Sequence, residues 1–499
     1  MDKSLPMQFE RNLISTKTRR LLNRIAVFLK SRDAKAYLVG GYVRDILLKR
    51  KTADIDIAVK GNALELAKPL AEKLGGTFVP LDMKNRVARI VLKDAARTEI
   101  DFTSFRGKIE ADLERRDFTI NAIAIDLDEV AGSGNIQLID PLNGINDLDN
   151  RVVRSASETA FSDDPVRVLR AVRFQTELGF RIDRHTGALA KKAASFLNQC
   201  AGERIREELM RLLDASHDAQ TILYVDKLGI INAAFPEMIR ARGVTQPVEH
   251  HWDVYDHSLK CVGAVDYVLH SGGWDYDDKW ILKAIPWPAV CPRYFSKQVA
   301  SGSTHRSLMK LAALLHDIAK PQTKAPDKNG RMRFLGHPEQ GAEIVENIME
   351  RLHFSSKEAK FVTVMVKYHL RPTQMGQPPT SRAIYRFFRD TGDAGLAVLY
   401  LSLADHLATR GPGLIPEGWK EHTNIVRCII KEHFRRDRIE PPRKLVDGHD
   451  LINVFGLKPG PKLGKLLEAV REAQATGELT NRQQTLDYIR NVLTGRKNR

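Results

Sequence analysis

The stretch LVGGYVRDILLKRKTADIDIAV, residues 38–59, decides the fold of the first part of the chain. The apolar run at residues 36–39 predicts a buried strand. Gly40 and Gly41 then predict a turn from this strand into a helix that carries Arg44. Glycines let a backbone approach a ligand closely, and amides at a helix N-terminus point toward phosphate groups. The strand, turn and helix therefore predict a triphosphate-binding site.

Paired acidic residues follow on the next predicted strand. In DIDIAV, residues 54–59, acidic and apolar side chains alternate, so Asp54 and Asp56 share one face of the strand. Hard oxygen ligands of this kind suit Mg²⁺ that carries substrate phosphates, whereas a solvated acidic loop is the alternative interpretation. Glu99 and Asp101 repeat the spacing in a second predicted strand. Asp54, Asp56 and Asp101 are thus candidate catalytic residues for a two-metal in-line displacement at a phosphate.

The chain as a whole divides into a part with a sheet and a helical part. Alternation recurs in VARIVL, residues 87–92, and in TEIDF, residues 98–102, which predicts a small mixed sheet with helices between its strands. From about Ser155 onward the pattern changes to long helical periodicity. The predicted fold class is α+β, with a mixed-sheet head and a mostly α-helical neck, body and tail. The predicted domains are residues 1–154, 155–215, 216–440 and 441–499.

The charge balance favours a polyanionic partner. The chain has 499 residues, with 78 Lys+Arg against 62 Asp+Glu, a net charge of +16 and 43% hydrophobic residues. This composition fits a soluble basic enzyme or a binder of polyanions better than an acidic or disordered protein, and it indicates folded domains with a basic surface. Positive charge concentrates phosphate-bearing ligands near a protein, and nucleic acid is the commonest of them. The alternative is that the charge serves solubility alone.

Cysteine usage and the N-terminal residues predict a cytoplasmic protein. The four cysteines lie far apart without a CxxC pair, which argues against a disulfide framework and a zinc ribbon. The N-terminal stretch lacks the apolar core of a signal peptide, and no stretch approaches the roughly 18 apolar residues of a membrane span. We therefore expect a reducing compartment and no membrane partner, while the residues do not indicate the oligomeric state.

Five blocks of sequence follow one another between residues 38 and 209. They are LVGGYVRDILL (38–48), RRDFTINAIA (115–124), IDPLNGINDL (139–148), SDDPVRVLRAVRF (162–174) and GERIREEL (202–209). Together they resemble the class II tRNA nucleotidyltransferases, the CCA-adding family of the polymerase-β-like superfamily, which also includes bacterial poly(A) polymerases. The resemblance implies a polymerase-β-like nucleotidyltransferase head, Mg²⁺ as its cofactor, and tRNA, CTP and ATP as its partners.

The same resemblance implies which residues bind the nucleotide. They are Gly40, Gly41, Arg44, Arg115, Arg116, Asp117, Asn121, Asp163, Asp164, Arg167, Arg170 and Arg173. Arg115, Arg116 and Asn121 offer fixed donors that would hold the triphosphate and the sugar. A helix cap with a salt-bridged surface is the alternative for this block.

The block around residue 164 is expected to select the base. In the family, an E/D-D-x-x-R group is understood to read the incoming nucleotide. A carboxylate accepts from the exocyclic amine of C or A, while the guanidinium donates to a ring nitrogen and a carbonyl oxygen. Asp163 stands where Glu is common, so Asp164 and Arg167 are the stronger candidates. Arg170 and Arg173 would contact tRNA or phosphate, or would form a plain salt-bridged face.

One departure from the family concerns the product. Only the stretch TSFRGKIEADLE, residues 103–114, separates the second acidic strand from Arg115. Enzymes that add the complete CCA end usually have a longer, flexible loop there, which is associated with the switch from CTP to ATP. The short stretch resembles the CC-adding subgroup and predicts that addition stops at CC.

A second cluster of metal-ligating residues falls in the helical part. In chain order its members are His257, His316, Asp317, His337, His369 and Asp405. The set, and above all LLHDIAK around the His-Asp pair, resembles the HD phosphohydrolase superfamily. The resemblance implies a divalent metal on His257, His316, Asp317 and Asp405. His337 and His369 would support a second ion or the substrate phosphate.

This HD site has a predicted metal class and a predicted reaction. Imidazole together with carboxylate favours Mn²⁺, Ni²⁺, Co²⁺ or Fe over Ca²⁺. Such a centre would hydrolyse phosphomonoesters or cyclic phosphodiesters, for instance at damaged tRNA 3′ ends before extension.

The last segment of the chain resembles the tail of the same family. A loop-to-helix junction there carries Gly456, Lys458, Gly460, Lys462 and Lys465. Backbone amides and ammonium groups suit contacts to tRNA phosphates, and a glycine-capped helix hairpin with a solvated lysine face is the alternative.

The function that these motifs predict is C addition, CC or CCA, at the tRNA 3′ end, with an additional HD phosphohydrolase site. A poly(A) polymerase would share the head but generally lacks the HD residues. An HD phosphohydrolase whose head only binds RNA is the other alternative.

Overall fold

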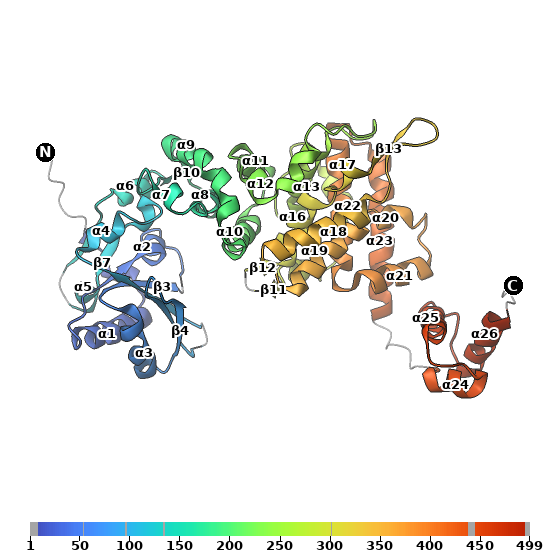
Figure 1. The fold of residues 1–499 in the computed structure, drawn as a ribbon, viewed down its shortest axis with the longest axis horizontal. Coiled ribbons are helices and arrows are strands. Elements are labelled where there is room, and N and C mark those ends of the chain that lie inside the picture. The colour runs from blue at the N-terminus through green and yellow to red at the C-terminus, as the bar shows by residue number, and fades with distance from the viewer. Residues whose placement is uncertain are drawn as a thin grey trace. The chain divides into compact units, whose positions relative to one another are not determined.

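A computed structural model describes residues 8–52, 54–94, 97–132, 135–300, 302–437 and 445–494. Contacts divide the chain into two compact units. The first comprises Met1–Cys200 and Leu228–Ala233, and the second comprises Ala201–Lys227 and Ala234–Arg499. The first contains a large mixed sheet with helices and the second is mostly helical (Figure 1). This confirms the predicted fold class, while the finer division into four domains stays a prediction.

The first unit is built on an eight-stranded sheet in the order β1-β8-β7-β2-β3-β6-β5-β4. Its strands are β1 (Gln8–Phe9), β2 (Ala36–Val39), β3 (Asp54–Lys60), β4 (Thr77–Asp82), β5 (Val87–Val91), β6 (Glu99–Phe105), β7 (Ala124–Asp126) and β8 (Ile136–Ile139). Within this sheet β3 and β6 pair in parallel and the other neighbours pair antiparallel. The predicted strands at residues 36–39, 54–59, 87–92 and 98–102 are confirmed.

Helices α1 and α3 lie side by side in this unit, and α2 begins at Gly40, directly after β2 (Figure 1). The helices are α1 (Thr16–Lys30), α2 (Gly40–Leu47), α3 (Ala63–Leu74), α4 (Ile109–Leu113), α5 (Leu127–Ala131), α6 (Gly144–Asp149), α7 (Ala160–Asp163), α8 (Arg167–Leu178) and α9 (Arg184–Ala193). Two short strands, β9 (Val152–Val153) and β10 (Arg181–Ile182), pair separately. The helix α12 (Ile230–Ala234) spans a boundary between the units.

The second unit is a helical body followed by the tail. Its helices are α10 (Gly202–Ala215), α11 (Ala219–Lys227), α13 (Val254–Val268), α14 (Lys279–Ala284), α15 (Cys291–Phe295), α16 (His305–Leu315), α17 (Lys320–Thr323), α18 (His337–Arg351), α19 (Ser356–Tyr368), α20 (Arg371–Gln374), α21 (Ser381–Thr391), α22 (Gly395–Arg410) and α23 (Pro416–Asp437), then α24 (Gly448–Phe455), α25 (Pro461–Ala475) and α26 (Arg482–Thr494) in the tail. Short strands are β11 (Gln298–Ala300), β12 (Ser303–Thr304), β13 (Lys324–Pro326) and β14 (Met332–Phe334).

The centre of the body is formed by α13, α16 and α22, which pack against one another. Most of α22 is buried because its sequence is apolar on all sides, as expected for a helix in the core. A fully buried ion pair, with Lys310 Nζ 2.6 Å from Asp266 Oδ2, links α16 to α13. These helices therefore form a rigid support for side chains that point between them.

The tail has an apolar core of its own and is joined to the body by ion pairs. Leu451, Leu466, Val470 and Ile489 belong to one buried cluster formed by α24, α25 and α26. Arginines of α21 face glutamates of α25. The N···O distances are 3.1 Å for Arg382–Glu472, 2.8 Å for Arg386–Glu472 and 3.1 Å for Arg389–Glu468.

Two sequence expectations about the whole chain have structural counterparts. All four cysteines are free thiols, as the spacing predicts. Within the described ranges, no helix combines the length and apolar character that crossing a membrane requires.

Candidate nucleotidyltransferase site and HD metal centre

The acidic residues of the head meet on one face of the sheet. In the parallel register of β3 and β6, Asp54 is opposite Glu99 and Asp56 is opposite Asp101. The intervening Ile55 and Ile57 are buried, which fixes the register and keeps the carboxylates together. Burial raises the pKa of Asp56 to about 6, with the nearby Arg116 guanidinium acting in the opposite direction. A cation bound at this face would stabilise the ionised form of Asp56.

The glycine turn lies directly against Asp56. Gly40 has a φ of +68°, and a Cβ added there would lie 3.0 Å from both Asp56 Oδ2 and Arg116 Nη1. The Tyr42 amide donates to Asp56 Oδ2 at 3.4 Å. Gly40 is therefore required both by its backbone conformation and by the close approach of these two side chains.

Arg89 is a member of the site that sequence reasoning missed. From β5 it donates to both carboxylate oxygens of Asp101, at 2.7 and 2.9 Å, and it also pairs with Glu99. Among the described residues, the Asp54 side chain has no such partner. The alternation of residues 87–92 places Arg89 on a sheet face, but its neighbour follows only from the order of strands β5 and β6.

A chain of hydrogen bonds holds the other predicted nucleotide ligands of the head. The buried Arg44 donates to Asn121 Oδ1 at 2.8 Å, and Asn121 donates to Asp117 Oδ1 at 3.0 Å. Arg170 on α8 donates to the other Asp117 oxygen at 3.2 Å. By contrast Arg115 is exposed and pairs loosely with Asp112, at 3.7 Å.

The predicted base-selecting residues separate into two groups. Arg167 donates to the backbone carbonyls of Ala160 and Arg115, at 3.2 and 3.3 Å, and its Nε lies 3.8 Å from Asp164 Oδ2. Asp163 is exposed and accepts from Thr159 at 2.9 Å instead. Arg167 is therefore held in place by two backbone carbonyls and lies next to Asp164, with which it pairs only loosely.

Arg173 lies deeper in the same helix than the base-selecting pair. It is buried, with its Nη1 2.8 Å from Glu177 and its guanidinium stacked on Phe174 at 4.4 Å. Its environment is that of a packed helix, which matches the salt-bridged alternative for this residue.

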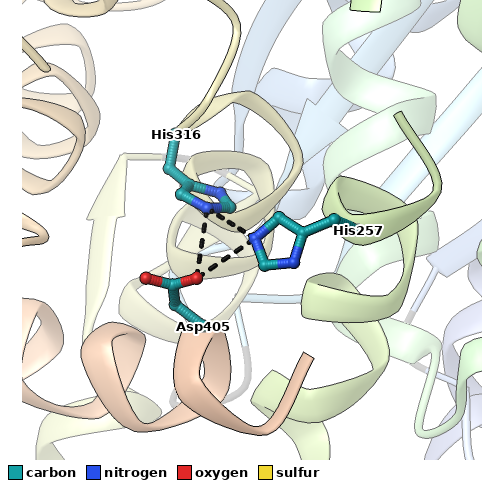
Figure 2. Close-up of side chains that lie close together, drawn as sticks. All are labelled: His257, His316 and Asp405. Carbon is teal, nitrogen blue, oxygen red and sulfur yellow. Dashed lines mark hydrogen bonds and ion pairs between the residues drawn. The ribbon is translucent and has the colours of Figure 1, made fainter. Parts of the chain in front are cut away.

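The six HD residues come together between the helices of the body. His257 from α13, His316 after α16 and Asp405 from α22 point toward one another (Figure 2). Their contacts are 3.1 Å between His257 Nε2 and His316 Nε2 and 3.1 Å between His257 Nε2 and Asp405 Oδ1. Asp317 Oδ2 lies 3.2 Å from His316 Nε2. Ligand atoms of the set His257-His316-Asp405 and of the set His316-Asp317-His369 are close enough to hold a metal ion, and the two sets share His316.

The histidine rings of this centre are oriented for metal binding. Nδ1 of His316, His337 and His369 lies 2.6 to 2.8 Å from a backbone carbonyl three residues earlier. Each Nε2 is therefore left as the free ring nitrogen, and those of His337 and His369 are buried without a hydrogen-bond partner. A carbonyl that fixes the tautomer in this way is typical of metal-binding histidines. The donor set fits a divalent transition metal.

The surroundings of the HD centre keep Asp317 ionised and His369 neutral. Despite burial, the neighbouring His316 and Lys320 hold the pKa of Asp317 well below its usual range. Burial lowers the pKa of His369 to about 3, which leaves that imidazole neutral, as a ligand must be.

Two residues next to the HD centre were not predicted. Lys320 Nζ lies 2.6 Å from Asp317 Oδ2, and the His250 ring lies 5.9 Å from that of His257. His250 falls in the irregular segment before α13, where the sequence has no periodicity that would place it. Lys320 follows Asp317 by one helical turn and could have been included.

The predicted tRNA-contacting residues of the tail lie in the turn between α24 and α25 and in the first turns of α25. Gly456 ends α24 in the left-handed conformation and Gly460 precedes α25. Lys458, Lys462 and Lys465 are exposed around this turn.

The head and the HD centre together define the class of protein, a nucleotidyltransferase head joined to an HD body. Residues 36–154 match the poly A polymerase head domain family, and residues 292–410 match the HD domain family. Residues 179–241 match a family described as a probable RNA and SrmB-binding site of polymerase A. Residues 418–489 match a putative tRNA nucleotidyltransferase domain 2.

Full-length relatives identify the family. An A-adding tRNA nucleotidyltransferase of Deinococcus radiodurans is 32% identical over 91% of this chain and 94% of its own length. A CC-adding tRNA nucleotidyltransferase of Thermus thermophilus is 31% identical over 91% of this chain and 93% of its own. One from Geobacter sulfurreducens, also CC-adding, is 32% identical over 91% of both chains. The chain belongs to the tRNA nucleotidyltransferases and is an enzyme, as the motifs imply.

Solved structures share the fold. The Thermotoga maritima CCA-adding enzyme in complex with tRNA has a TM-score of 0.61 at 23% identity, and the match covers 98% of this chain and 100% of that one. A CCA-adding enzyme with CTP has a TM-score of 0.63, also at 23% identity, covering 98% and 97%.

Proposed function

We propose that the enzyme adds C residues from CTP to the 3′ end of tRNA, with release of pyrophosphate, and stops at CC. The observation that carries the restriction to CC is the connection between β6 and α4. Strand β6 ends at Phe105 and α4 begins at Ile109. Phe105, Ile109 and Leu113 are buried in one apolar cluster, so little chain is left for a loop that could move. CC-adding enzymes are among the relatives, as is an A-adding enzyme of similar identity, so the proposed product rests on this short connection.

The proposed transfer uses the acidic face of the sheet. Asp54 and Asp56 would hold Mg²⁺, which when bound favours ionisation of the tRNA 3′-hydroxyl and neutralises charge on the phosphates. Asp101 would complete the acidic face, with Arg89 fixing its orientation. Gly40 and Gly41 leave room for the triphosphate beside Asp56. Arg116 would contact the phosphates.

The product is tested by extending tRNA that lacks its last three nucleotides. With CTP and ATP both present, we expect two C residues to be added and no A, as resolved on a sequencing gel. A tRNA that already ends in CC should remain unextended with ATP. A complete CCA end, or addition of A to the CC-ended tRNA as in an A-adding enzyme, would contradict the proposal.

Base selection is expected to depend on Asp164 and Arg167. We expect Arg167→Ala to lower kcat/KM for CTP about tenfold to a hundredfold, because a bidentate base contact is worth about 1–3 kcal/mol. The preference for CTP over UTP should fall with it. The matched control is Arg181→Ala, an exposed arginine in the same part of the chain. Steady-state kinetics with each triphosphate distinguish the two, and an unchanged CTP preference in Arg167→Ala would refute this role.

The HD centre would be a second active site. The donor set of imidazoles and carboxylates supports Mn²⁺, Ni²⁺, Co²⁺ or Fe, and the reaction would be hydrolysis of phosphomonoesters or cyclic phosphodiesters at RNA ends. The exposed lysines of the tail would contact tRNA phosphates. Four free thiols support a place in the reducing cytoplasm.

A further inference from the structure

A cavity in the helical body contains none of the residues of the two candidate sites. Its volume is 460 Å³. Part of its lining comes from α19, and further lining residues belong to β11 and to the short helix η5 (Gly392–Ala394). Its lining combines basic, aromatic and aliphatic side chains with the two carboxylates Asp390 and Asp393, and such a mixture suits a ligand with one charged and one apolar end.

Helix α19 places its basic side chains before its apolar ones along the cavity. Lys357, Lys360, Phe361 and Val364 follow the spacing i, i+3, i+4 and i+7, so they share one face of the helix. The two lysines lie in the first turns, where the helix dipole also favours an anion. At 1.5 Å per residue the backbone positions of Lys357 and Val364 are about 10 Å apart, close to the distance from phosphate to base in a nucleotide.

The two lysines are the uncompensated cations of the cavity. Lys297 lies 3.5 Å from Asp393, and Arg389 lies 2.8 Å from Asp390. For Lys357 and Lys360, the described part of the chain provides no acidic partner. Their ammonium groups therefore remain available for a phosphate.

His305 is a buried residue of the cavity lining. It lines the cavity, is only 2% exposed, and its ring stacks on Phe361 with centroids 4.4 Å apart. Its Nδ1 is buried and has no hydrogen-bond partner. Burial lowers the pKa of His305 to about 4, so the ring is neutral near pH 7. A hydroxyl group would satisfy Nδ1 in either tautomer, because it both donates and accepts.

We propose that this cavity binds a ribonucleotide. Its phosphate would lie between Lys357 and Lys360, a ribose hydroxyl on His305, and the base against Phe361 and Val364. A free ribonucleotide and a nucleotide within an RNA chain share this chemistry. The site is separate from the triphosphate site of the head, so its failure would leave the proposed C addition unaffected.

The test compares the double variant Lys357→Ala/Lys360→Ala with Lys367→Ala, which removes an exposed lysine of the same helix outside the cavity. The probes are AMP and CMP by isothermal titration calorimetry and tRNA by filter binding. If the source is a free nucleotide, the wild type and Lys367→Ala show a second mononucleotide site that is at least tenfold weaker in the double variant. If the source is RNA, the double variant binds tRNA at least tenfold more weakly than the control.

A variant of His305 and a crosslinking experiment test whether the ligand binds in this cavity. His305→Phe keeps the stacking on Phe361 but removes the hydrogen-bonding atom, and we expect it to weaken the same ligand about fivefold, the effect of one lost hydrogen bond. Photocrosslinking with 8-azido-AMP should label the peptide that contains α19. Unchanged binding of both AMP and tRNA in the double variant would overturn the proposal. So would inorganic phosphate binding as tightly as AMP, which would mean an adventitious anion only.

Discussion

Replacing Asp54 and Asp56 together by asparagine is expected to lower kcat/KM for C addition by about a thousandfold or more, equivalent to about 4 kcal/mol. The two side chains lie on one face of β3, next to the paired strand β6. Asparagine keeps their shape while removing both negative charges. Without those charges the head would no longer hold Mg²⁺ beside the triphosphate. Single-turnover extension of truncated tRNA with CTP measures the effect.

The fold of this variant should survive. Burial raises the pKa of Asp56 to about 6, so its ionised form is disfavoured in the folded head, and a neutral amide relieves that cost above pH 6. Thermal unfolding near pH 7 should therefore show a melting temperature equal to or above that of the wild type. Asp149→Asn, at an exposed position of the same unit, is the matched control and should keep full activity. Normal extension by the double variant would refute the assignment of the metal site.

Replacing His316 by alanine is expected to abolish metal binding at the HD centre. The ring belongs to both possible ligand sets, with His257, Asp317 and Asp405 around its Nε2. After incubation with Mn²⁺ and gel filtration, we expect the wild type to retain about one ion or more per chain and the variant less than a tenth of that. Hydrolysis of a cyclic 2′,3′-phosphodiester should be lost in parallel.

C addition should not depend on the HD centre. C addition by His316→Ala should stay within about twofold of the wild type, because the acidic ligands of the head belong to a different unit. His353→Gln, an exposed histidine of the same body, is the control for nonspecific loss of imidazole. His369→Gln offers a second test if the alanine variant is poorly folded. Full metal retention in both variants would contradict the HD assignment.

One apolar run and the alternation of apolar with polar residues were enough to predict the strands that carry the site. β2, β3, β5 and β6 all have buried positions at a spacing of two. β4 was missed because it contains Pro80, lies at the sheet edge and has no buried residue, so it lacks the pattern of a buried strand. β1, β7 and β8 have two to four residues each, too few for any periodicity to appear.

Side-chain partners were harder to predict than elements. The contact of Arg89 with Asp101 depends on β5 lying next to β6, and the sequence pattern contains no information about strand order. The HD residues were found because the family spacing indicates them. His250 lies next to them only because of the conformation of the irregular segment before α13, and no local sequence rule predicts that conformation.

The pairs between α21 and α25 affect how the enzyme would hold a large substrate. An exposed ion pair is worth about 0.2–1 kcal/mol. The arginines of these pairs are partly exposed although Glu472 is buried, and Arg382 also lies 2.6 Å from Glu478 of the tail. The four pairs would therefore hold the tail by a few kcal/mol, and by less at high salt. Because the tail has an apolar core of its own, it would remain folded on release. Ionic strength would therefore change the reach of the enzyme as well as its affinity, by setting how often the tail is free to search for the far end of a tRNA.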